Sequence, residues 1–150
     1  MNIYELSKYI VKKYNSDMYE ITNLRLQKIL YYIQGYYYKI KSKPAFIEEF
    51  YNWSYGIAVK EIYFEYIGNG TNNILSEEDI LTEPKLSNIN KVDKKLINQI
   101  IIKSYNYSTK SLVKKTLAET PCISTQKGSI VPKQEIKDYF LEHDPLAIIE

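Results

Sequence analysis

This sequence has one cysteine, Cys122, and one histidine, His143, the residue types that bind zinc or act together as a nucleophile and its base. A structural zinc site needs about four Cys or His ligands and a catalytic one about three. We therefore expect no metal site and no cofactor. A Cys–His pair would require His143 to activate Cys122. His143 instead follows a predicted helix, whose C-terminus favours a cation at the surface. We expect a protein that is not an enzyme.

Two other patterns have the spacing of a chemical site. Glu61 and Glu65 are four residues apart and share one face of a predicted helix, where they could hold a hard cation or form a solvated face. We interpret them as solvated. The segment from Gly68 to Gly70 lacks the spacing and the Lys-Ser/Thr ending of a phosphate-binding loop, so we interpret it as a surface turn.

Charge is unevenly distributed although the formal net charge is only +2. Residues 48–83 contain many acids and one base, Lys60, whereas residues 85–115 contain many lysines and one acid, Asp93. This asymmetry indicates either two segments that face each other or a surface with two electrostatic poles. The lysines could meet phosphates, but the arginine that commonly reads bases is missing there. We do not expect nucleic acid or a membrane as a partner, and we expect a cytoplasmic location.

Hydrophobic periodicity predicts the elements that must position these groups. It favours an all-α fold, a compact single domain over residues 1–150 with about six helices and one short extended segment. The predicted helices cover residues 3–14, 22–39, 57–67, 91–105, 109–119 and 132–142. Residues 46–55 are expected to form a short helical turn followed by a tight loop, with an extended piece near 129–131. Pro121 is expected to end the fifth helix.

Three segments together resemble the Panacea domain family, which contains the SocA-like antitoxins and many prophage-associated proteins. The segments are Leu24–Gly35 (LRLQKILYYIQG), Trp53–Val59 (WSYGIAV) and Ser111–Cys122 (SLVKKTLAETPC). Ile57, Leu117 and Cys122 stand where the family usually has proline, histidine and tryptophan. The order and spacing of the segments fit across nearly the whole chain.

The resemblance singles out ten motif residues that we expect to be mostly structural. They are Leu26, Gln27, Lys28, Leu30, Tyr31, Trp53, Gly56, Val59, Tyr63 and Pro121. Among them, we expect the apolar members, Trp53 included, to lie in the core. Gly56 is expected to supply a backbone geometry that a side chain forbids. Gln27 and Lys28 are expected to tie their helix to a neighbour, because buried polar groups need partners.

The resemblance implies an antitoxin that binds and neutralises a cognate protein toxin, typically one encoded beside it. The alternatives are an adaptor that delivers the toxin to a Clp-type protease and a nucleic-acid-binding regulator. Tyr36, Tyr37 and Tyr38 point about 100° apart on a helix and cannot share one buried stripe. We therefore expect Tyr36 or Tyr38 to face solvent or to contact the partner. Glu61 and Glu65 are the second candidate contact, because many toxins that cut RNA are basic.

Overall fold

The computed structural model describes residues 1–149 and shows a mainly helical fold with one small antiparallel sheet. The elements, in chain order, are α1 (Ile3–Ser16), α2 (Asn23–Lys41), β1 (Phe50–Trp53), β2 (Gly56–Ala58), α3 (Lys60–Glu65), the 3₁₀ turn η1 (Ile67–Asn69), α4 (Lys91–Ser104), α5 (Thr109–Leu117), α6 (Thr120–Ile123), β3 (Ile130–Val131) and α7 (Lys133–Glu142). The predicted all-α fold is thus confirmed as mainly helical.

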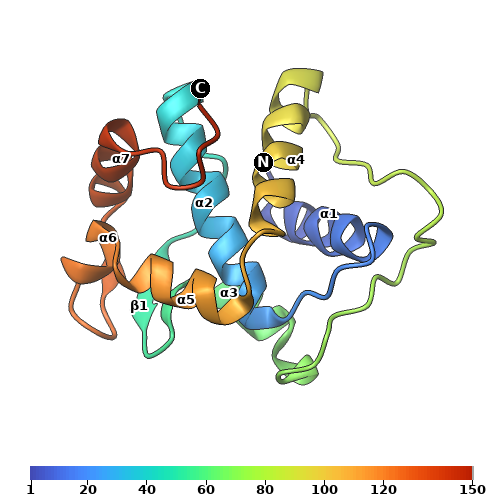
Figure 1. The fold of residues 1–150 in the computed structure, drawn as a ribbon, viewed down its shortest axis with the longest axis horizontal. Coiled ribbons are helices and arrows are strands. Elements are labelled where there is room, and N and C mark those ends of the chain that lie inside the picture. Colours follow the sequence, from blue (N-terminus) through green and yellow to red (C-terminus); the bar gives the residue numbers. More distant parts are fainter. Residues whose placement is uncertain (150) are drawn as a thin grey trace.

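Helix α2 is the centre of the molecule, and the other elements pack around it (Figure 1). It begins where the Thr22 hydroxyl accepts a hydrogen bond from the Arg25 backbone N–H. Helices α7, α4, α5 and α1 and strand β2 all contact it. Because it is covered on every side, the exposed polar stripe of an ordinary surface helix is missing, and almost every residue from Asn23 to Tyr38 is buried.

Local signals located most helices correctly. Asn2, Asn90 and Ser108 each accept backbone hydrogen bonds as N-caps of α1, α4 and α5. These side chains satisfy N–H groups that have no partner inside the helix, so the helices begin within a residue of the predicted positions.

The segment from 46 to 55 was predicted wrongly as a helical turn. Phe50 and Asn52 are buried while Tyr51 and Trp53 are only half-buried, which is the two-residue period of a strand. Strand β1 pairs with β2 on one side and β3 on the other, in the order β2-β1-β3. The expected extended piece near 129–131 is confirmed, because it contains β3.

Two helix boundaries also differ from the prediction. The helix expected at 57–67 begins only at Lys60, because residues 56–58 pair with β1. Pro121 does not simply end a helix. Helix α5 already ends at Leu117, and Pro121 occupies the first turn of the short helix α6, a position that needs no backbone N–H donor.

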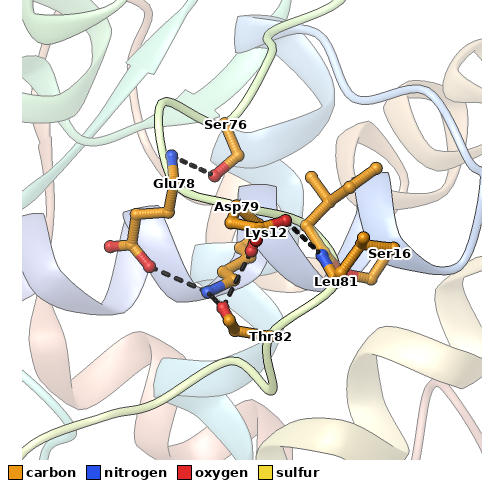
Figure 2. Close-up of polar contacts among 8 residues, drawn as sticks. Lys12, Ser16, Ser76, Glu78, Asp79, Leu81 and Thr82 are labelled. Carbon is orange, nitrogen blue, oxygen red and sulfur yellow. Dashed lines mark hydrogen bonds and ion pairs between the residues drawn. The ribbon is translucent and has the colours of Figure 1, made fainter.

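The long connection between η1 and α4 forms a wide arc (Figure 1), and hydrogen bonds from α1 hold it at several points. Ile74 is buried in the core, and the Asn15 amide holds the backbone of Ile74 and Ser76. Figure 2 shows the Lys12 ammonium donating to Glu78 at 3.0 Å and to Thr82 at 2.6 Å. One buried lysine of α1 therefore anchors this acidic connection.

Replacing Lys12 with methionine should release the connection while leaving the fold intact. Glu78 is 61% exposed, so the ion pair is screened, and we expect a loss of at most about 1 kcal/mol in global stability. A glutamate-specific protease should cut the connection after Glu77 or Glu78 several-fold faster than in the wild type. Lys13→Met, which removes only the ion pair with Asp17, is the matched control. Equal cleavage rates in the two variants would show that Lys12 does not anchor the connection.

Among the described residues, no helix is both long enough and apolar enough to cross a membrane.

Candidate functional site

The three family-like segments meet at Gly56. Its backbone has a φ of +97°, which side chains rarely adopt. A Cβ on Gly56 would lie 3.3 Å from the Lys28 ammonium and 3.4 Å from a methyl carbon of Leu117. Glycine is therefore needed here for its conformation and for the close approach of α2 and α5, as expected.

Gln27 and Lys28 attach α2 to the β1–β2 hairpin, which confirms their expected role. The Gln27 side-chain oxygen accepts from the Val59 backbone N–H at 2.8 Å, and the Lys28 ammonium donates to the Ile57 carbonyl at 2.9 Å. Lys28 is only 1% exposed, and burial lowers the pKa of its ammonium to about 8. The chain thus keeps a buried amine, with no described ion pair, in order to hold the hairpin.

A buried carboxylate attaches the next turn of α2. The hydroxyls of Tyr31 and Tyr32 donate to the two oxygens of Glu119 at 3.0 and 2.9 Å, and Lys115 lies 3.8 Å away. Burial raises the pKa of Glu119, while the hydrogen bonds from Tyr32 and Tyr31 oppose this rise. These contacts hold the α5–α6 corner against α2.

Cys122 and His143 make separate contacts. The Cys122 thiol is buried and donates to the Asn52 side-chain oxygen at 3.1 Å, and burial raises its pKa. His143 is exposed, and its ring stacks on Tyr139 with the centroids 4.3 Å apart. A raised thiol pKa is the opposite of what an activated cysteine requires. No group of three or more His, Cys, Asp or Glu side chains within residues 1–149 is arranged to hold a metal ion.

The other motif residues divide between core and surface. Leu26, Leu30, Val59 and Pro121 are buried, as expected for structural positions. Trp53 was expected in the core, but it is half-buried because it alternates with the inward-facing Asn52 on β1. Part of the Trp53 side chain therefore remains accessible at the surface.

The expectation that Tyr36 or Tyr38 faces solvent was wrong. Tyr36 is fully buried, because α7 and the segment after it cover its side of α2, and Tyr38 is only 7% exposed. The Tyr36 hydroxyl donates to the Asp144 carboxylate and accepts from the Leu146 backbone N–H. Neither tyrosine presents a surface to a partner.

Three half-buried aromatic side chains and one exposed one gather where β1 meets α3. The ring of Trp53 stacks on Tyr51 at 5.9 Å and meets the edge of Tyr63 at 5.2 Å, and Tyr63 contacts Phe64 at 5.5 Å. Phe64 is 60% exposed. We call Tyr51, Trp53, Tyr63 and Phe64 the aromatic face. Tyr51 and Phe64 were not identified as candidate contacts from the sequence, although the alternation along β1 would have indicated Tyr51.

Glutamates border the aromatic face. A hollow of about 350 Å³ beside Tyr51 is lined by Ile47, Glu48, Glu49, Tyr51, Lys60 and Glu61. One carboxylate oxygen of Glu48 and one of Glu61 are buried without a hydrogen-bond partner. Glu65 is exposed on the same helix as Glu61. Of the two candidate contact residues from the sequence, Glu61 thus lies next to the aromatic face, whereas Glu65 follows Phe64 in the chain and lines a second hollow with Lys8 and Tyr66. Their role in binding stays a prediction.

The acidic and basic segments do not neutralise each other. None of the described ion pairs joins an acid of residues 48–83 to a lysine of residues 85–115. Glu78, for example, pairs with Lys12, and Asp93 pairs with Lys41. Of the two interpretations of the charge asymmetry, the arrangement therefore supports separate surface regions of opposite sign.

The convergence of motif segments at Gly56 agrees with a family model. Residues 26–122 match the model of the antitoxin SocA-like Panacea domain, and the chain therefore belongs to this family. No curated protein and no solved structure matches the chain.

Proposed function

We propose that this member of the SocA-like Panacea family is an antitoxin that neutralises a cognate protein toxin by binding it directly. The observation that carries the proposal is the family match over residues 26–122. The match starts inside α2 and ends in α6, while α1 and α7 pack on the same central helix. We therefore propose that residues 1–150 act as one domain.

The contacts of the motif residues support a role through surface binding. Lys28, Gln27 and Glu119 hold the hairpin and the α5–α6 corner in place through buried hydrogen bonds. Their polar atoms are occupied inside the fold. What the motif provides is a rigid platform, and a rigid platform lowers the entropy cost of binding a partner.

Co-expression with the product of the neighbouring reading frame tests the proposal. We expect that product to arrest growth alone and growth to recover when this chain is expressed with it. The two purified proteins should also form a complex in size-exclusion chromatography. A failure of rescue with both proteins folded and expressed would contradict the antitoxin role.

The same experiment separates direct neutralisation from delivery to a protease. Under direct neutralisation, rescue persists in a host that lacks the Clp proteases, and the half-life of the toxin does not fall. If rescue is lost in that host and the half-life of the toxin recovers, the adaptor alternative applies. The proposed location in both cases is the cytoplasm.

A further inference from the structure

We infer that the aromatic face is the surface that binds the toxin, and that the toxin presents a basic patch, rich in arginine or lysine, to it. This inference rests on the proposed antitoxin function and adds the site and the chemistry of the partner. Its two supports are the geometry of the aromatic rings and the sign of the charge around them.

The rings are arranged as anchors for a protein interface. Trp53 is held between Tyr51 and Tyr63, so its position is set before any partner binds. Phe64 extends the same cluster into solvent. Aromatic side chains are enriched at the energetically dominant positions of interfaces, because they bury a large area at a low cost in side-chain entropy.

The backbone beneath the aromatic face is anchored to the core. Asn52 lies between Tyr51 and Trp53 and donates to the carbonyls of Cys122 and Thr125 at 3.0 and 2.7 Å. The Asn23 amide donates to the Tyr63 carbonyl at 3.0 Å and so joins α3 to α2. Both halves of the face therefore keep a fixed geometry, which supports binding without rearrangement.

The charge around the face selects a basic partner. Glu48, Glu61 and Glu65 form none of the described ion pairs. Of the lysines nearby, Lys133 pairs with Glu49, Lys127 donates to the Trp53 carbonyl at 3.1 Å, and Lys60 lies 5.4 Å from the centroid of the Tyr51 ring. A guanidinium or ammonium from the partner would pair with the exposed carboxylate of Glu65 and would be attracted by the carboxylates of Glu48 and Glu61, and charge-assisted hydrogen bonds are strong.

The exposed apolar side chains of α4 provide a contrasting surface. Val92 and Ile102 are 64% and 51% exposed, but Lys91, Lys95 and Lys103 are exposed on the same helix. A basic partner would be repelled there. This surface therefore supplies matched control substitutions.

The test measures binding of the purified product of the neighbouring reading frame to variants of the full chain. The double variant Phe64→Ala/Trp53→Ala should have a dissociation constant on the order of 100-fold higher than the wild type and should not rescue growth. The double variant Glu61→Lys/Glu65→Lys should raise the dissociation constant by about 10-fold or more and make binding less dependent on salt. Val92→Ala with Ile102→Ala and Lys95→Glu with Lys103→Glu are the controls, and they should bind like the wild type. Thermal unfolding of each variant verifies the fold.

Each outcome has a separate meaning. Wild-type affinity in both the aromatic and the glutamate variants, with the wild type binding normally, overturns the inference and leaves the antitoxin role intact. A change in the self-association of the chain alone, caused by the aromatic variants, would make a second copy the occupant and would also overturn it. If the wild type neither binds nor rescues, the proposed function itself fails. If the aromatic variant does not fold, the glutamate variant decides alone, because Glu65 is exposed and Glu61 makes none of the described hydrogen bonds.

Discussion

Replacing Gly35 with alanine is expected to destabilise the fold by about 3 kcal/mol and to lower the melting temperature by roughly 10 °C. A Cβ at Gly35 would overlap the ring of Phe140, which α7 presses against the backbone of α2. Phe140 is fully buried among Tyr31, Tyr32 and Tyr36, so its ring cannot move aside. Alanine would gain about 1 kcal/mol in helix propensity, but the overlap outweighs this gain.

Chemical denaturation measures this effect, and a second glycine provides the control. Gly68 has nothing within 4 Å of the position of its missing Cβ, so Gly68→Ala should change stability by no more than about 0.5 kcal/mol. Adding Phe140→Leu to Gly35→Ala should recover part of the loss, because the two positions are in contact and their effects are not additive. A Gly35→Ala variant as stable as the wild type would show that α2 and α7 do not approach this closely.

Replacing Lys28 with methionine is expected to remove a rise in stability with pH that the wild type shows above pH 8. Burial lowers the pKa of Lys28 from 10.5 in the unfolded chain to about 8 in the fold. Between these values an unfolded Lys28 binds more protons than a folded one, so the contribution of Lys28 to the free energy of unfolding increases with pH. At about 1.4 kcal/mol per pKa unit, the whole window corresponds to about 3 kcal/mol.

Urea unfolding of both proteins at pH 7, 8, 9 and 9.5 measures the difference. At pH 7 we expect the two stabilities to agree within about 1–2 kcal/mol, because relief from burying the ammonium offsets the lost hydrogen bond to the Ile57 carbonyl. As pH rises, the free energy of unfolding of the wild type should increase relative to that of the variant. Lys103→Met, at an exposed site, controls for the loss of one positive charge. If the free energies of unfolding of the wild type and Lys28→Met changed in parallel with pH, the lowered pKa of Lys28 would be contradicted.

Local signals explain why the helices could be predicted from the sequence. Asn2, Asn90 and Ser108 cap their helices through contacts that span three residues or fewer. Interactions of such short range depend only on the neighbouring sequence. The role of Gln27 and Lys28 could be predicted for a related reason, since a polar side chain within an apolar stripe must find a partner once the stripe is buried.

The candidate site was only half predictable. Glu61 and Glu65 stood out from the charge pattern, but Tyr51 did not, because the segment around β1 was interpreted as helical. Phe64 lies on the predicted helix α3 and was not singled out by any pattern. Strand pairing decides that segment, and β1 obtains its partners from residues 56–58 and from residues 130–131. The second of these partners lies about eighty residues away, beyond the reach of any local pattern.

By itself, the sequence determined the helical class, the starts of α1, α4 and α5, and the motif that joins α2 to the hairpin. Only the tertiary structure decided which tyrosines are accessible. Helical geometry requires Tyr36, Tyr37 and Tyr38 to point in different directions, and that remains true in the fold. All three are nevertheless buried, since α7 packs on one side of α2 and α4 on another, while Tyr51 and Trp53 remain at the surface. The burial of a side chain depends on what packs over it, and the elements that cover α2 come from distant parts of the chain.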